Sequence, residues 1–233
     1  MSELILALDL PDAPTALQQA DELRGIIRWC KVGSELFTLA GPSLVHSLRD
    51  MGFSIFLDLK FYDIPHTVAG AVTAAASTGA AMLSLHCQGG RRMCRAARDA
   101  ALAVRRMRGF APLLFGVTVL TSFDDGEMPG ISLAPSAFAQ HLAFLAKDSG
   151  LDGVICSARE AGNIKKASPG LPCLCPGIRP AWAPADDQRR IMTPAEAVAT
   201  GADYLVVGRP ILEATDKIRA TQRILAEMCN QQD

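Results

Sequence analysis

The sequence lacks a marked excess of charge of either sign. Its 233 residues carry 23 lysines and arginines against 24 aspartates and glutamates, so the formal net charge is −1. Proteins that bind nucleic acid usually present a strongly basic face. The arginines between positions 91 and 108 alternate with alanines, as the solvated side of a helix does. We therefore predict no nucleic-acid partner.

A secretion leader and a membrane-spanning run are also missing from the sequence. The N-terminus, MSELILALDLPD, has no basic region and reaches acidic residues after a few apolar ones, whereas a membrane helix needs about 20 apolar residues. The seven cysteines form an odd set without a CxxC pair, which suits reduced thiols in a reducing compartment. These features predict a cytoplasmic protein with no membrane partner.

Metal-binding motifs are absent as well. No HExxH motif or carboxylate cluster has metal-ligand spacing, so we predict no metal site. Cys173 and Cys175 could ligate a metal, but two alternate residues without a partner cluster are more often packed in a core. His86 ends a predicted strand and could face a site, whereas His46 and His141 lie in helical patterns and are expected to be structural.

The sequence does contain a regular alternation of short apolar runs and helical patterns. The predicted strands cover residues 4–10, 30–33, 54–60, 81–87, 113–120, 153–157, 172–177 and 204–208. The helical patterns between and after them include 13–27, 43–51, 67–78, 90–107, 136–150 and 210–229. Eight β/α units in this length predict an α/β fold, a (β/α)8 TIM barrel that forms a single catalytic domain over residues 1–233. A doubly wound sheet is the alternative, but no GxGxxG motif follows the first strand. The longest irregular stretch, residues 176–194, is expected to be a functional lid.

Charged residues stand where several predicted strands end. In FSIFLDLK, Asp58 and Lys60 share a strand face, and in a barrel that face points inward at the carboxyl-terminal mouth. Asp9 and Lys31 end the first two strands in the same way. The alternative is an ion-pair network that only plugs the barrel. Asp63 has its own alternative, because it could cap the helix that follows Pro65.

Other polar residues follow the later strands. Thr121 and Ser122 close the fifth predicted strand, where hydroxyl groups could bond a polar ring or simply form a turn. Gly208 and Arg209 follow the eighth, and in barrels the loops after strands seven and eight commonly hold phosphate. Arg179 and Gln188 in the long loop could close over the same phosphate, although Arg179 by itself would be an ordinary loop arginine.

The ordered motifs together resemble the orotidine 5′-phosphate decarboxylase family. They are LALDLPD, KVGSELF, FLDLKFYDIPHTV, GVTVLTS, PGIRP, DDQRRIMTP and VVGRPI, and they run over nearly the whole chain. Cys175 before PGIRP is a departure, because many members have threonine there. The resemblance implies a homodimeric barrel that converts orotidine monophosphate to uridine monophosphate and carbon dioxide, without a cofactor.

The resemblance also implies a role for each matching residue. Lys60 is the implied proton donor to C6 of the pyrimidine, beside the Asp58 carboxylate. Asp9 and Lys31 belong to the charge network and ribose site. The implied residues at the neighbouring subunit's site are Asp63, Ile64 and Thr67. Those at the pyrimidine edge and the phosphate are Thr121, Arg179, Gln188, Gly208 and Arg209.

Two other functions fit parts of this pattern. A magnesium-dependent sugar-phosphate decarboxylase also carries DxK, but such enzymes tend to have an acid where Lys31 stands and lack the DQRR loop. A non-catalytic phosphate-binding barrel would not need Asp58, Lys60 and Asp63 together.

Overall fold

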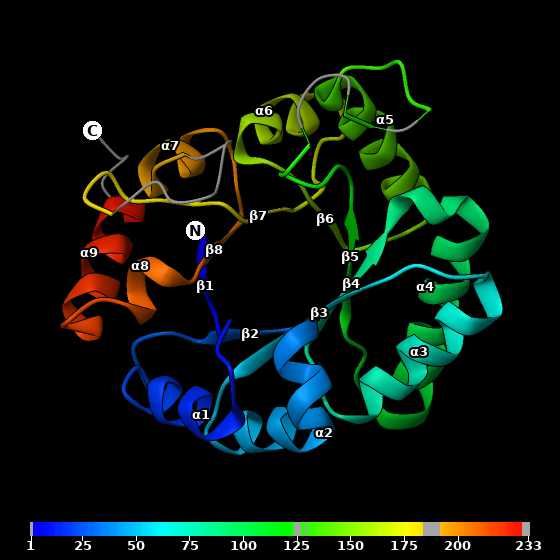
Figure 1. The fold of residues 1–233 in the computed structure, drawn as a ribbon. Helices are drawn as coiled ribbons and strands as arrows, with labels where there is room; N and C mark the ends of the chain where they lie inside the picture. Colours follow the sequence, from blue (N-terminus) through cyan, green and yellow to red (C-terminus); the bar gives the residue numbers. More distant parts are fainter. Residues whose placement is uncertain (1, 124–126, 129, 184–191, 230–233) are drawn as a thin grey trace.

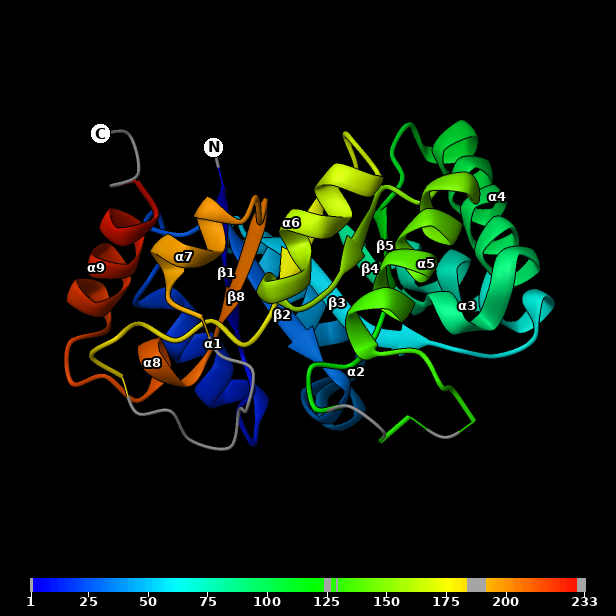
Figure 2. The ribbon, with the colours of Figure 1, turned by 90° about the horizontal axis from the view of Figure 1, so that it is seen from above.

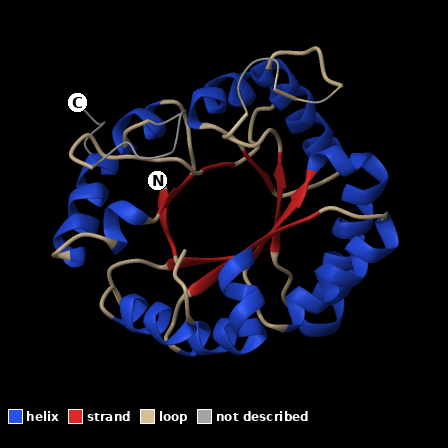
Figure 3. Cartoon of the chain, viewed as in Figure 1, coloured by secondary structure: helices blue, strands red, loops and turns tan. Residues whose placement is uncertain are grey.

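Eight parallel strands close into one barrel in the computed structural model, which describes residues 2–123, 127–128, 130–183 and 192–229. Each strand is hydrogen-bonded to its neighbours in chain order, and β8 pairs with β1. Figures 1 and 3 show the ring of strands surrounded by helices. The predicted single-domain (β/α)8 fold is confirmed.

The strands are short, as parallel barrel strands usually are. They are β1 (Glu3–Ala7), β2 (Trp29–Gly33), β3 (Ser54–Phe61), β4 (Met82–His86), β5 (Leu113–Val117), β6 (Gly153–Ile155), β7 (Cys173–Cys175) and β8 (Tyr204–Val207). The helices are α1 (Ala13–Asp21), α2 (Ser34–Asp50), α3 (Pro65–Ser77), α4 (Gly90–Arg108), α5 (Pro135–Asp148), α6 (Ala158–Ala167), α7 (Pro194–Ala199), α8 (Arg209–Leu212) and α9 (Lys217–Cys229), with a short 3-10 turn at Cys87–Gly89.

Side-chain alternation divides the core into two parts. Ile55 and Leu57 of β3 belong to the large apolar cluster between the strands and the helices. Phe56 belongs to a smaller cluster that fills the barrel interior with Ile5, Trp29, Met82, Phe115, Ile155 and Leu174 among others. The predicted assignment of β3 side chains to its two faces is therefore correct, and the inward face is the one that continues to Asp58 and Lys60.

Several predicted boundaries differ from the structure. The strands β1 and β5 end at Ala7 and Val117, earlier than the predicted residues 10 and 120, so Asp9 lies beyond its strand and Thr121 lies further from the end of β5 than expected. The register of β5 with β4 and its register with β6 both end at Val117. Helix α2 begins at Ser34, well before the predicted 43–51, because a kink at Gly41 (φ 63°) ahead of Pro42 joins two helical segments.

The helical pattern 210–229 forms two helices, α8 and α9. The carboxyl ends of the strands lie along the lower edge of Figure 2, where α8 and the chain after β7 are also found. Among the described helices, none combines the length and the apolar character that a membrane span requires.

Candidate active site

A cavity of about 550 Å³ opens at the carboxyl ends of the strands. Eight of the residues selected from the sequence line it: Asp9, Lys31, Asp58, Lys60, Thr121, Arg179, Gly208 and Arg209. Four cations, from two lysines and two arginines, face three carboxylates, because Glu213 joins Asp9 and Asp58. Apolar walls come from residues such as Phe56, Val117 and Ile155. The cavity suits an anionic ligand with a flat or apolar part.

Lys60 and Asp58 form an ion pair at the end of β3. The Lys60 Nζ lies 2.8 Å from Asp58 Oδ2, and the Asp58 side chain is 11% exposed. Lys60 has a φ of 50°, and it is the one described non-glycine residue with positive φ. The β3–β4 register also shifts between Leu57 and Phe61. This local irregularity sets the direction of the lysine, since strained backbone and bulges of this kind often aim side chains at sites.

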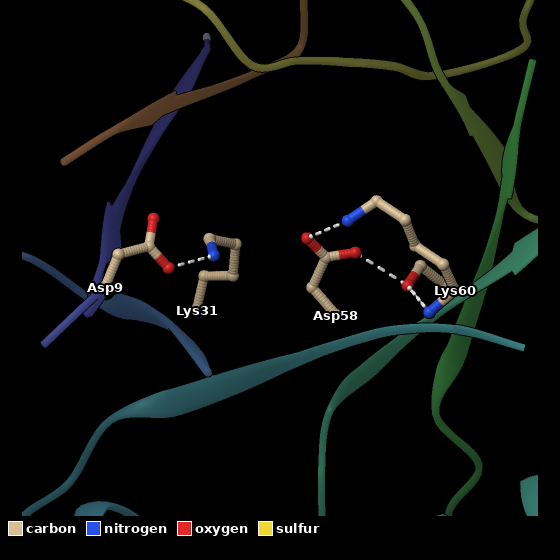
Figure 4. Close-up of polar contacts among 5 residues, drawn as sticks. Asp9, Lys31, Asp58 and Lys60 are labelled. Atoms are coloured by element: carbon tan, nitrogen blue, oxygen red, sulfur yellow. Dashed lines mark hydrogen bonds and ion pairs between the residues drawn. The ribbon is translucent and has the colours of Figure 1, made fainter. Parts of the chain in front are cut away.

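Ser84 of β4 links the two residues and was missed by the sequence analysis. Its hydroxyl donates to Asp58 Oδ1 at 2.7 Å and accepts the Lys60 backbone N–H at 2.9 Å. Figure 4 labels Asp58 and Lys60, the two residues that this hydroxyl group joins. A signal was present, because a serine in the apolar run AMLSLHC falls on the inward face.

Asp9 and Lys31 form a second ion pair, from the chain after β1 and from β2. Lys31 Nζ lies 2.7 Å from Asp9 Oδ1, and the side chains are 11% and 62% exposed. Figure 4 shows Lys31 between Asp9 and Asp58. A Cβ on Gly33 would lie 3.1 Å from the Lys31 amine and 3.3 Å from the Asp9 carboxylate. Glycine at this position leaves room for the pair.

Two arginines follow β7 and β8, where the sequence predicts a phosphate-binding site. Arg179 is buried, and its backbone N–H donates to the Met192 carbonyl at 2.9 Å. Arg209 begins α8, directly after Gly208. A Cβ on Gly208 would approach the Ala7 Cβ at 3.3 Å, so glycine lets the two strand ends come close. Gln188 lies outside the described residues.

Asp63, Ile64 and Thr67 stand apart from the cavity. All three are exposed, Ile64 to 66%. The suggestion that Asp63 caps α3 is wrong, because the N-cap residue is Ile64 and no side chain caps the helix. The Asp63 carboxylate accepts the adjacent Ile64 N–H at 2.6 Å instead.

Thr121 reaches the cavity from the loop after β5, whereas Ser122 is exposed and does not line it.

His86 ends β4 as predicted but is not among the cavity's lining residues. Its ring packs 5.5 Å from that of Tyr62. Burial lowers the pKa of His86, the Lys60 charge lowers it further, and Asp58 opposes both. The lowered pKa favours the neutral form of the imidazole.

The predicted cysteine packing also has a clear structural basis. Cys173 and Cys175 are both fully buried in the large apolar cluster. The hydrogen bond with the Cys156 thiol, together with burial, raises the pKa of Cys173. Across the described parts of the chain, no group of three or more histidine, cysteine or acidic residues is arranged to hold a metal ion.

Comparisons with known proteins agree with these motifs. Residues 2–224 match the family model for orotidine 5′-phosphate decarboxylase / HUMPS. The orotidine 5′-phosphate decarboxylase of Nitratidesulfovibrio vulgaris strain DP4 is 52% identical over 230 residues, which cover 98% of each chain. That of Pseudomonas aeruginosa strain LESB58 is 49% identical over 229 residues, 97% of each chain.

A solved structure supports the same relationship. The crystal structure of orotidine 5′-phosphate decarboxylase from Lactobacillus acidophilus matches with a TM-score of 0.86 and 34% identity, over 98% of this chain and 99% of that one. Sequence and architecture thus agree over essentially the full length. The chain belongs to the orotidine 5′-phosphate decarboxylase / HUMPS family.

Proposed function

We propose that this cavity converts orotidine 5′-phosphate to uridine 5′-phosphate and carbon dioxide, with Lys60 as the proton donor. The enzyme is a carboxy-lyase of pyrimidine biosynthesis, and its catalytic domain is the single barrel of residues 1–233. Family membership supports the reaction. One observation carries the assignment of residues: an ion-paired lysine amine, 2.8 Å from Asp58, lines the cavity.

The order of the strands suggests how the nucleotide lies. The phosphate binds near β7 and β8, where Arg179 and Arg209 offer planar cations suited to phosphate oxygens and Gly208 also lines the cavity. Gln188, which lies outside the described residues, is kept as a further proposed phosphate ligand. The ribose lies over the neighbouring strands β1 and β2, at Asp9 and Lys31. The pyrimidine extends toward Lys60 on β3, with Thr121 at its edge.

The reaction requires stabilisation of a carbanion. When carbon dioxide leaves C6, the C6–carboxylate bond breaks and its electron pair remains in the ring plane, where the π system cannot delocalise it. The Lys60 ammonium is a fixed positive charge for that pair in a cavity with apolar walls. It then transfers a proton to C6, so one residue stabilises charge and acts as the general acid.

Asp58 acts on the substrate carboxylate. Two negative charges about 4 Å apart repel by about 4 kcal/mol at an effective dielectric near 20. The repulsion disappears as neutral carbon dioxide leaves, which favours the transition state over the ground state. Ser84 and Lys60 bind the two Asp58 oxygens and thereby hold the carboxylate in place.

We further propose that the active unit is a homodimer in the cytoplasm. Asp63, Ile64 and Thr67 are exposed and lie away from their own cavity, which suits residues that reach a neighbouring subunit's site. A cytoplasmic location suits the cysteines, because six of the seven free thiols are buried and unpaired.

The two competing functions have less support. A magnesium-dependent sugar-phosphate decarboxylase would be expected to have an acid at the end of β2, whereas Lys31 occupies that position and is paired with Asp9. A passive phosphate-binding barrel has no use for the Lys60–Asp58–Ser84 arrangement, which lies on strands distant from the two arginines.

The test mixes purified protein with orotidine 5′-phosphate and a chelator and follows the pyrimidine absorbance. We expect full turnover with and without the chelator. Loss of turnover that magnesium restores would support the sugar-phosphate class of mechanism instead. Tight binding of uridine 5′-phosphate without any turnover would support the passive barrel.

A further inference from the structure

The chain that leaves β7 crosses to α9 on the outside of the barrel, as the yellow segment in Figures 1 and 2 shows. Trp182 makes the contacts at that point. Its indole N–H donates to Glu227 Oε1 at 3.0 Å, and the Arg223 guanidinium lies 4.9 Å from the indole ring centroid. Arg223 Nε also lies 4.0 Å from Glu227 Oε1. Both partners belong to α9, so the tryptophan fixes this segment to a helix.

We refer to the contacts of Trp182 with Arg223 and Glu227 as the anchor. Arg179 stands three residues before Trp182 in the chain. Its backbone is tied to Met192, and the Ala183 N–H donates to the Pro180 carbonyl at 3.0 Å, which closes a turn that carries Trp182. Arg179 lines the cavity, whereas Trp182, Arg223 and Glu227 do not. A short stretch of chain, residues 180–181, joins Trp182 to Arg179, so the contacts of Trp182 with α9 act on the cavity through Arg179.

We propose that Trp182 is a positioning residue that holds Arg179 in reach of the substrate's phosphate, an inference that rests on the function proposed above. Without the anchor, Arg179 samples more conformations, and phosphate binding must restrict them again. A group held in place before the reaction contributes more to the transition state than one that must be ordered during it. The contribution of Trp182 is then limited to substrates that carry the phosphate.

The chain contains a matched control at the opposite end of the barrel. Trp29, the first residue of β2, donates its indole N–H to Glu3 Oε2 at 2.8 Å, and Arg28 lies 5.7 Å from its ring centroid. Glu3→Ala therefore removes the same kind of interaction as Glu227→Ala. Neither Glu3 nor Trp29 lines the cavity.

The experiment compares kcat/KM for orotidine 5′-phosphate and for orotidine, which lacks the phosphate, in wild type, Trp182→Ala, Trp182→Phe, Glu227→Ala and Glu3→Ala. We expect Trp182→Ala to lower kcat/KM for the phosphorylated substrate by about ten-fold or more and to leave that for orotidine within about two-fold. Trp182→Phe keeps an aromatic ring for Arg223 and should recover part of the loss. Glu227→Ala should lower kcat/KM for the phosphorylated substrate in the same way as Trp182→Ala. Glu3→Ala should leave the ratio of the kcat/KM values for the two substrates unchanged.

An equal fall for both substrates would overturn the proposal, because it would indicate general damage to the barrel. Unchanged kinetics in Trp182→Ala would overturn it as well. If wild type turned over neither substrate, the proposed function would fail separately, and the affinities of wild type and Trp182→Ala for uridine 5′-phosphate and for uridine would still test the anchor. A phosphate-specific loss of affinity would support it, and an equal or absent loss would contradict it.

Discussion

At the scale of single residues, Lys60 differs from the other described residues in its backbone conformation. It is charged, it has a φ of 50°, and its amine lies in the cavity beside Asp58. Holding a lysine in this conformation costs about 1 kcal/mol or more. Such strain often occurs at functional sites, and here it accompanies the group proposed to donate the proton.

We expect Lys60→Ala to lower kcat by at least about 10³-fold, because the variant loses both the fixed cation and the proton donor. Binding of uridine 5′-phosphate should persist, since the arginines near β7 and β8 are unchanged. Steady-state kinetics and calorimetric titration measure the two effects. The exposed Lys147 provides the control variant Lys147→Ala, and near-normal turnover by Lys60→Ala would refute the proton-donor assignment.

Ser84 is predicted to be the residue that orients Asp58. Replacing it with alanine leaves Asp58 Oδ1 and the Lys60 backbone N–H without their hydroxyl partner. We expect a loss of about 1–3 kcal/mol in the free energy of unfolding, together with a fall of about ten-fold in kcat. Urea unfolding and kinetics provide the measurements.

Ser149→Ala is the matched control for Ser84. The Ser149 side chain is also buried, and no hydrogen-bond partner for its hydroxyl is found in the described structure. The control should therefore change neither stability nor kcat appreciably. Equal effects of the two serine variants would contradict the orienting role of Ser84.

At the scale of elements, the strand ends determine what the cavity contains. Alternation along FSIFLDLK predicted the correct inward face of β3, and Asp58 and Lys60 line the cavity. Alternation could not predict the register shift between Leu57 and Phe61, because a bulge depends on pairing with a neighbouring strand. The hydrogen bonds of Ser84 to the residues of β3 escaped prediction for the same reason.

The junction of β2 and α2 offers a test at this scale. Gly33 has a φ of −88°, so alanine fits the backbone, but its Cβ would lie 3.1 Å from Lys31 Nζ. We expect Gly33→Ala to displace the Asp9–Lys31 pair by a few tenths of an ångström and to lower kcat/KM by about ten-fold. Enzyme kinetics with orotidine 5′-phosphate measure this effect.

Gly162→Ala in α6 is the corresponding control. An added Cβ there meets only the Thr200 carbonyl, at an ordinary 3.5 Å. Alanine should raise the free energy of unfolding by about 0.5–1 kcal/mol and leave kinetics unchanged. If Gly33→Ala also retained normal kinetics, the close fit around the ion pair would have no functional importance.

At the scale of the whole molecule, the proposed dimer makes a specific prediction about mixed subunits. In the proposed dimer, Asp63 contributes to the active site of the neighbouring subunit, and Lys60 contributes to the active site of its own subunit. A dimer of one Lys60→Ala subunit and one Asp63→Ala subunit then has one doubly altered site and one intact site. Random assembly of two inactive variants should restore about a quarter of the wild-type activity per site. Co-expression of the two variants with the same affinity tag keeps all three dimers together, and assay of this purified mixture provides the measurement.

The control for this experiment mixes Lys60→Ala with Asp58→Ala. These residues bind one another within the same cavity, so each mixed dimer has two altered sites and no activity should return. Absence of recovery in the Asp63 mixture as well would contradict the cross-subunit role of Asp63.

The buried thiols predict how stability depends on alkaline pH. Burial raises the pKa of Cys30 from 9.0 to about 12. Above pH 9 the unfolded chain therefore loses a proton that the folded chain keeps, and the free energy of unfolding falls as pH rises from 9 toward 12. The Cys30 thiol alone should lower the free energy of unfolding by about 1 kcal/mol between pH 8 and pH 10.

Urea unfolding under reducing conditions at several pH values measures the effect. Cys30→Ala should be less stable at pH 8 because of the cavity it creates, but its stability should fall less steeply above pH 9. Parallel curves for the two proteins would show that Cys30 makes no contribution to the alkaline slope.

The sequence by itself determined the eight-fold β/α pattern, the inward face of β3 and the motifs that identify the family. Those properties depend on side-chain period and local residue order, which the linear chain already carries. Only the tertiary structure decided the hydrogen bonds of Ser84 to Asp58 and to the Lys60 backbone, the room that Gly33 leaves and the contact of Trp182 with α9. Each depends on the distance between groups that separate strands or helices bring together, and chain order does not specify such distances until the barrel closes.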